Sequence, residues 1–97
     1  MKVSIPHKLS SVEAITRVRK VLNESRSKLA AHLTETEEKW EGNTLHFAFT
    51  AQKQHISGTL EVKDNVFELY AKLPLTLRLF EGRIEKMIKE QAGVMFG

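Results

Sequence analysis

The sequence predicts an α+β domain in which a five-stranded, mainly antiparallel sheet carries two helices on one face, in the order β-α-β-β-β-β-α. Three observations support this prediction. Apolar and polar residues alternate through four consecutive segments between Thr36 and Ala71. Two-residue turn signals separate these segments at Gly42-Asn43, Gln52-Lys53 and Asp64-Asn65. Apolar residues at helical spacing occur before and after this region.

The N-terminal third of the chain predicts one strand followed by one helix. Residues 2–7 alternate between apolar and polar side chains, as in a short strand. Ser10 and Glu13 have the spacing of a capping box, which satisfies free backbone N–H groups at a helix start. We expect this helix to continue to about Ala31 and residues 34–38 to form an acidic connection to the first strand of the meander.

The three turns fix the register of the meander, and the register decides which side chains share a face. With two-residue loops, Phe47 lies opposite Gly58, and every large apolar side chain except Val66 and Tyr70 falls on one face. We expect this face to be buried against the helices. The residues expected to meet there are Trp40, Leu45, Phe47, Phe49, Ile56, Leu60, Val62, Phe67 and Leu69 from the strands, and Ile15, Val18, Leu22, Ile84 and Ile88 from the helices.

The C-terminal quarter predicts a single helix that begins near Pro74. Proline suits the first turn of a helix, and the apolar residues that follow it have helical spacing. The last residues, Val94, Met95 and Phe96, remain apolar. Residues 1–97 therefore predict one domain without an internal linker.

Composition limits the classes of function. The chain has no cysteine, which excludes thiol catalysis and thiolate metal sites. The net charge of +3 comes from 15 basic and 12 acidic residues whose signs are interleaved, so we expect no nucleic-acid partner. No apolar stretch approaches the roughly 20 residues of a membrane span, and the N-terminus does not resemble a signal peptide. We therefore expect a cytoplasmic bacterial protein.

The titratable residues do not form a recognisable catalytic set. His46 and His55 fall on the outer sheet face but are offset by about four residues, or roughly 13 Å along a strand. Glu61 and Glu68 oppose each other on the same face, which favours a solvated pair over a general acid because no apolar pocket adjoins them. We expect no catalytic residue, no metal site and no cofactor.

Two kinds of surface are candidate binding sites. One is an apolar ligand site between the C-terminal helix and the sheet, lined by Trp40, Phe47, Phe49, Phe80 and Ile84, although such residues are more often plain core. The other is an interaction surface made of small outer-face residues and the apolar tail. Its members are Ala48, Thr50, Ser57, Thr59, Val94, Met95 and Phe96.

Four short motifs occur in order along the chain. They are His7-x-Leu9-Ser10, Trp40-x-Gly42-Asn43-x-Leu45-x-Phe47, Ser57-Gly58-Thr59-Leu60-x-Val62, and Leu73-Pro74 before Phe80-x-Gly82-x-Ile84. Together they resemble the short bacterial polyhydroxyalkanoic acid system proteins, also called polyhydroxyalkanoate granule region proteins. The resemblance implies an association with storage-polyester metabolism, at the granule or its proteins, and brings no catalytic residue with it.

Two functions follow as expectations. The first is a non-enzymatic accessory protein of polyester granules that acts through protein or granule-surface contacts. The second rests on a weaker similarity to helix-grip domains, and is a small carrier of an apolar ligand between the C-terminal helix and the sheet. A hollow larger than about 300 Å³ would favour the carrier. We also expect a homodimer, because either candidate interaction surface could pair across a two-fold axis.

Overall fold

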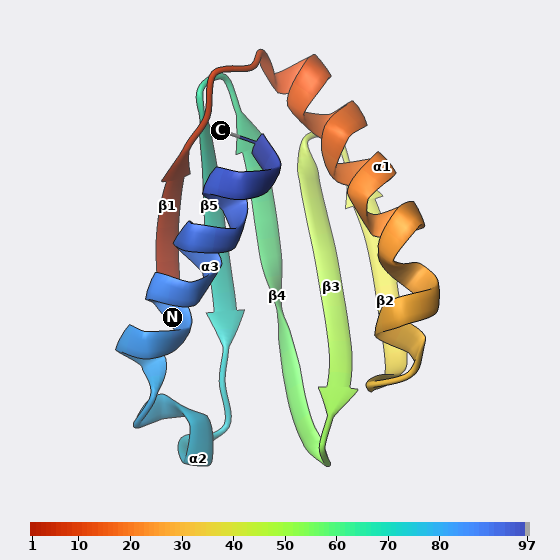
Figure 1. The fold of residues 1–97 in the computed structure, drawn as a ribbon, viewed down its shortest axis with the longest axis vertical. Coiled ribbons are helices and arrows are strands. Elements are labelled where there is room, and N and C mark those ends of the chain that lie inside the picture. Colours follow the sequence, from red (N-terminus) through yellow and green to blue (C-terminus); the bar gives the residue numbers. More distant parts are fainter. Residues whose placement is uncertain (97) are drawn as a thin grey trace.

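The computed structural model describes residues 1–96, apart from the side chain of Leu29, and contains one antiparallel five-stranded sheet with the order β1-β5-β4-β3-β2 (Figure 1). The predicted fold class is confirmed. The strands are β1 (Lys2–Pro6), β2 (Leu33–Glu41), β3 (Thr44–Ala51), β4 (Gln54–Lys63) and β5 (Val66–Lys72), and the helices are α1 (Ser11–Ala30), α2 (Leu75–Arg78) and α3 (Glu81–Phe96).

The predicted register of the meander is confirmed at all three turns. Trp40 pairs with Leu45, Phe47 with Gly58, and Leu60 with Leu69. Each of these turns contains a residue with a positive φ angle. Gly42 has a φ of 59°, which is in the left-handed region that glycine enters without a steric penalty.

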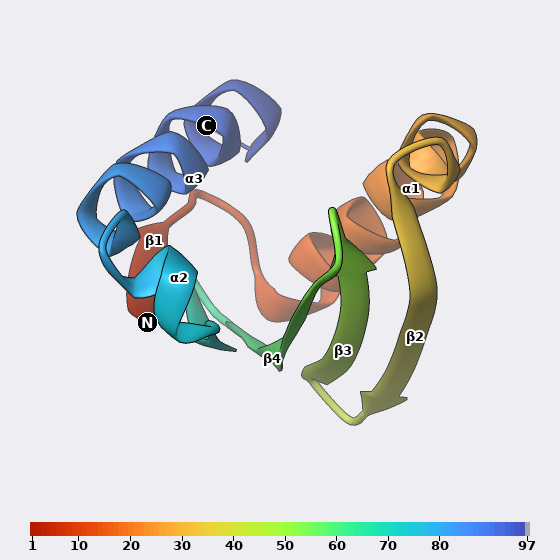
Figure 2. The ribbon, with the colours of Figure 1, turned by 90° about the horizontal axis from the view of Figure 1, so that it is seen from below.

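One side of the sheet carries the apolar residues and both long helices (Figure 2). The buried core lies near the upper end of the sheet in Figure 1. It consists of Val3, Ile5, Ala14, Val18, Val62, Phe67 and Ala92. Further down the same face, Phe47, Phe49 and Ile56 are only half-buried. Their face was predicted correctly, but their full burial was not, because the helices diverge over this part of the sheet (Figure 1).

The start of α1 is tied to the end of the β4–β5 hairpin. The Ser11 N–H donates to the Asp64 carboxylate at 2.7 Å, and the Glu13 N–H donates to the Ser10 hydroxyl at 3.2 Å. Half of the predicted capping box is therefore present, because the Glu13 carboxylate accepts the Ser10 hydroxyl at 3.2 Å and not the Ser10 N–H. From this fixed point α1 runs across to the β2 edge, whereas α3 lies over the β1 side of the sheet (Figures 1 and 2).

Strand β2 starts earlier than predicted, at Leu33. Residues 34–38 belong to the strand and do not form a connection. Its pairing with β3 shifts between Thr34 and Glu37, and Glu35 there has a φ of 51°. This bulge breaks the alternation of faces and leaves a run of exposed polar side chains, so the segment has no apolar pattern that indicates a strand.

The predicted C-terminal helix is interrupted. The one-turn helix α2 ends at Arg78, and α3 begins at Glu81. The Phe80 N–H bonds to the Leu77 carbonyl at 3.0 Å, a tighter turn than that of an α-helix. Because the chain changes direction there, Phe80 leaves the stripe that continues in α3 and is 51% exposed.

Gly58 is required by contacts within the sheet. A Cβ atom at this position would overlap the Tyr70 carbonyl oxygen and would lie 2.9 Å from both the Ala71 Cα and the Phe47 ring. The missing side chain therefore makes room for the neighbouring strand and for Phe47.

We predict that Gly58→Ala destabilises the fold by about 3 kcal/mol, because the strand pair must separate to admit the methyl group. Urea unfolding measures the change. Gly93→Ala is the matched control, since nothing lies within 4 Å of the Cβ position in this α3 residue, and we expect it to stabilise by about 0.5 to 1 kcal/mol. Equal effects of the two substitutions would contradict the proposed role of Gly58.

His7 joins the end of β1 to the β4–β5 turn. Its Nδ1 accepts the Leu9 N–H at 3.0 Å, so Nε2 carries the proton that is donated to the Lys63 carbonyl at 2.9 Å. The buried ring lies 4.4 Å from that of Phe67, which in turn lies 5.0 Å from that of Phe96. This histidine thus connects the start of α1, the sheet and the end of α3.

We predict that His7→Ala lowers the free energy of unfolding by about 2 to 4 kcal/mol, because it leaves two backbone groups without partners and creates a void beside Phe67. Thermal and urea unfolding test this. His46→Ala, at an exposed position on the other face of the sheet, serves as the control and should change stability by less than about 0.5 kcal/mol. A similarly small change for His7→Ala would be inconsistent with this role.

Candidate functional site: an apolar groove between the helices

Two adjoining hollows lie on the inner face of the sheet, where the helices leave it uncovered. The first, between α1 and α3, has a volume of about 360 Å³. The second, between α1 and the β2–β3 edge, has a volume of about 570 Å³. Leu22, Leu60 and Leu69 line both hollows. We therefore treat them as one feature, the inner groove, with these three leucines at its centre.

The hollow between the helices is almost entirely apolar. Gln91 is the one polar residue among those that line it. Strands β1, β4 and β5 form its floor, and α1 and α3 form its walls. The lining residues are Ile5, Val18, Val21, Leu22, Leu60, Phe67, Leu69, Met87, Ile88, Gln91, Ala92, Met95 and Phe96. Such a lining favours a ligand without charge in this part of the groove, because a charge would lose its hydration without finding a partner.

The hollow at the β2 edge has an apolar floor and a charged rim. Phe47 and Phe49 contribute to the floor, together with Leu45. At the rim, the Arg26 guanidinium lies 3.1 Å from the Glu38 carboxylate. Both side chains are partly exposed, so this pair contributes at most about 1 kcal/mol to stability.

The balance of charge at this rim is negative. Glu35, Glu37 and Glu38 line the hollow with Arg26, and Arg26 also donates to the Asn23 side chain at 3.1 Å. A carboxylate or phosphate head group would therefore meet three carboxylates and one cation that already has partners. The rim favours a neutral or cationic group over an anion.

The five residues predicted to line an apolar ligand site lie in different environments. Phe47 and Phe49 line the inner groove, whereas Trp40, Ile84 and Phe80 are not among its lining residues. Trp40 packs against the core beneath the Arg19 guanidinium, which lies 4.7 Å from the indole ring.

Three small residues of the predicted interaction surface, Thr50, Ser57 and Thr59, do not line the inner groove, whereas Ala48 is among the residues that line its second hollow. All four are half-buried among their strand neighbours. Thr50 contacts the His55 ring at 3.4 Å across the β3–β4 pair. The homodimer expected from this surface stays a prediction.

The apolar tail is divided between solvent and groove. Val94 is 84% exposed, whereas Met95 and Phe96 line the inner groove. Phe96 also packs against the core. Residues 94–96 therefore form the last turn of α3, and Phe96 packs this turn against the core.

The polar side chains of the outer face form isolated local contacts. Glu61 and Glu68 are directly opposed, but Lys63 lies 3.8 Å from Glu61 and the Ser4 hydroxyl donates to Glu68 at 2.7 Å. Within residues 1–96, no group of three or more His, Asp or Glu side chains could hold a metal ion. The arrangement of these groups is that of a solvated sheet face.

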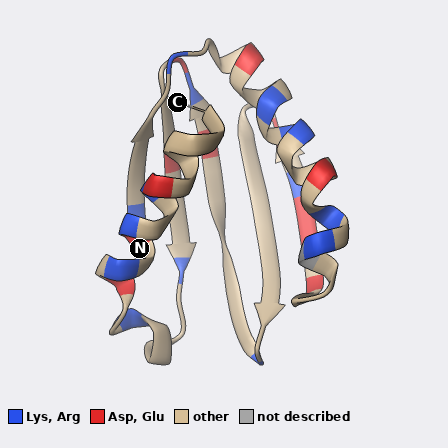
Figure 3. Cartoon of the chain, viewed as in Figure 1, with Lys and Arg blue, Asp and Glu red and all other residues tan. Residues whose placement is uncertain are grey.

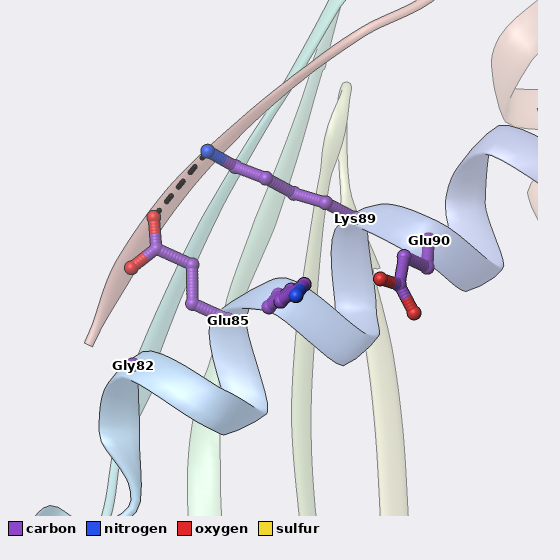
Figure 4. A pocket seen from close by; sticks show the side chains of 5 residues that line it. Gly82, Glu85, Lys89 and Glu90 are labelled. Atoms are coloured by element: carbon purple, nitrogen blue, oxygen red, sulfur yellow. Dashed lines mark ion pairs between the residues drawn. The ribbon is translucent and has the colours of Figure 1, made fainter.

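A further hollow of about 400 Å³ lies along the solvent side of α3 (Figure 4). Glu85 and Lys89 point toward each other and pair at 3.5 Å, while Glu90 points away from them. A pair four residues apart stabilises a helix by about 0.3 to 0.5 kcal/mol. We assign this hollow to the solvated face of the helix.

Met87 and Gln91 line the groove but were not predicted as site residues, whereas Met95 was predicted as part of the interaction surface. Met87 and Gln91 follow helical spacing, which is compatible with core packing as well as with a groove. A signal was present in the polar segment Thr34–Glu38. Residues 34–38 contain no apolar side chain, which indicates that this part of β2 contributes nothing to a buried core.

A comparison with protein families places the chain in a family. Residues 1–95 match the family described as "Putative polyhydroxyalkanoic acid system protein". The chain therefore belongs to this family, and the resemblance stated from its motifs is confirmed. Comparisons with curated proteins and with solved structures gave no match. None of the helices described in residues 1–96 has the length and apolar character that crossing a membrane requires.

We predict that the inner groove binds a neutral apolar dye such as Nile red, and that Ala30→Trp or Gln91→Trp weakens this binding about tenfold. Ala30 and Gln91 line the groove but are exposed, so an indole there can fill a hollow without disturbing the core. Fluorescence titration measures the affinity, and tenfold corresponds to about 1.4 kcal/mol.

Ala31→Trp and Glu90→Trp are the matched controls. They place the same side chain one residue away, at exposed positions that do not line the groove. Equal dye binding by all four variants would show that the dye occupies another surface.

Proposed function

We propose that this protein is a non-enzymatic accessory protein of polyhydroxyalkanoate metabolism that binds the storage polyester directly, with the inner groove as its contact surface. The observation that carries the proposal is the continuity of the groove, since two apolar hollows of about 360 and 570 Å³ share Leu22, Leu60 and Leu69. Family membership supplies the metabolic context.

The chemistry of the groove matches that of a polyester chain. A polyhydroxyalkanoate is neutral along its length and carries alkyl side chains, and its ester oxygens need few hydrogen-bond donors. The groove offers apolar walls with one amide, at Gln91, and a rim whose charge disfavours anions. Burial of apolar surface would drive the contact at about 25 cal/mol per Å².

The openness of the groove supports a contact protein over an enzyme. The inner groove contains no histidine, aspartate, serine or lysine among its lining residues. Its acidic groups, Glu35, Glu37 and Glu38, lie at the exposed rim. We therefore assign this surface a binding role without a chemical step.

A carrier of a free apolar ligand is the second candidate. The size of each hollow favours it, because each exceeds about 300 Å³, the lower limit of usual ligand sites. The negative rim favours a neutral ester over a free fatty acid. Isothermal titration with the methyl ester of a medium-chain hydroxy acid distinguishes the two candidates. One-to-one binding by a protein that does not bind the polymer would favour the carrier.

We predict that the purified protein sediments with washed, protein-free polyester granules, and that Ala30→Trp and Gln91→Trp reduce the bound fraction several-fold. Filling either hollow removes apolar surface that the polymer would cover. The Ala31→Trp and Glu90→Trp controls should sediment like the unaltered protein. Unchanged sedimentation of the groove variants would exclude the groove as the polymer contact.

A further inference from the structure

One end of the molecule exposes three large apolar side chains around α2. Leu75 is 77% exposed, Leu79 is 87% exposed and Phe80 is 51% exposed. We call these three residues the α2 tip; α2 lies at the lower end of the sheet in Figure 1. Three such side chains within six residues of sequence exceed the scattered exposure of single apolar residues that is normal for a protein surface.

The segment that carries the α2 tip is held in place by the fold. Leu73, just before it, is buried, and Leu77, between the exposed residues, is half-buried. The Thr76 hydroxyl donates to the Gln54 side chain at 3.0 Å. This bond connects α2 to the β3–β4 hairpin, so the apolar side chains project from an anchored turn.

Three cations lie at the same end of the molecule as the α2 tip. Lys53 lies in the β3–β4 turn, Lys72 ends β5, and Arg78 ends α2. Figure 3 shows these basic segments at the same end of the molecule. All three side chains are exposed, and within the part of the chain that the structure describes none of them forms an ion pair. The nearby Glu81 carboxylate lies 3.0 Å from the Met1 amino group.

We propose that the α2 tip docks onto an anionic lipid surface, with Leu75, Leu79 and Phe80 inserted at the level of the head groups and the three cations beside them. Apolar insertion combined with basic residues is the arrangement by which proteins bind a lipid interface without spanning it. Each cation near an anionic leaflet contributes to binding within about a Debye length of the surface.

The charges select this partner over two others. A neutral polyester would bind the leucines but would leave the cations without a role. A second copy of the chain, packed tip to tip, would bring the same cations together and repel itself. An anionic lipid surface accommodates the apolar side chains of the α2 tip and also attracts the three cations beside it. This docking is independent of the inner groove, because neither the tip nor its three cations are among the groove's lining residues.

Vesicle flotation tests the proposal, with phosphatidylcholine vesicles compared with vesicles of phosphatidylcholine and phosphatidylglycerol. We expect binding to the mixed vesicles, weak binding to the neutral ones, and loss of binding at high salt. Leu79→Ser should weaken binding about tenfold through lost apolar burial. Arg78→Gln and Lys53→Gln should each weaken it roughly fivefold.

Val12→Ser and Arg17→Gln are the matched controls. Val12 is 74% exposed and Arg17 is exposed, and both lie on α1. They should bind like the unaltered protein, and so should the groove variants Ala30→Trp and Gln91→Trp. Circular dichroism melting verifies that each variant is folded.

Three outcomes would overturn the proposal. They are equal binding to neutral and mixed vesicles, unchanged binding by Leu79→Ser, and a dimer in sedimentation equilibrium that Leu79→Ser dissociates. The last result would show that the tip contacts a second copy. A failure of the groove variants to affect polyester sedimentation would not change the vesicle result, so the two proposals stand or fall separately.

Discussion

The register of the β3–β4–β5 meander is the constraint on which the rest of this structure depends. Because side chains alternate strictly along a strand, the two-residue turns at Gln52-Lys53 and Asp64-Asn65 place Leu45, Leu60 and Leu69 on the same face. That face must be covered or left as a binding surface. The helices α1 and α3 cover parts of this face, and the points at which they attach to the sheet determine which part of the face remains open.

Those attachment points lie at one end of the sheet. His7 and Asp64 hold the start of α1 near the β4–β5 turn, and Phe96 packs the end of α3 against Phe67 at the same end. The core is therefore tight there. Away from it, α1 follows the β2 edge and α3 follows the β1 side, so Phe47 and Phe49 between them are left half-buried. The inner groove results from this divergence of the helices.

The sequence predicted the features with local causes and missed those with distant ones. Gly42-Asn43 and Asp64-Asn65 indicate turns by their own chemistry, and the register follows from loop length alone. The bulge near Glu35 has no such signal, because its residues are polar on both faces. The interruption at Phe80 was hidden by helical spacing that continues past it. The position of the groove depends on where α1 is attached to the sheet. That attachment includes the hydrogen bond between His7 and the Lys63 carbonyl, residues 56 positions apart in the sequence.

The charged residues beside the two apolar surfaces have opposite signs. The groove rim carries Glu35, Glu37 and Glu38, whereas the α2 tip is accompanied by Lys53, Lys72 and Arg78. A net charge of +3 averages over this asymmetry and conceals it. An anionic surface would attract the cations beside the tip and repel the carboxylates of the groove rim. The neutral polyester proposed to bind in the groove would be attracted by the apolar walls alone. The charges therefore favour different partners for the contact proposed at the groove and the contact proposed at the tip.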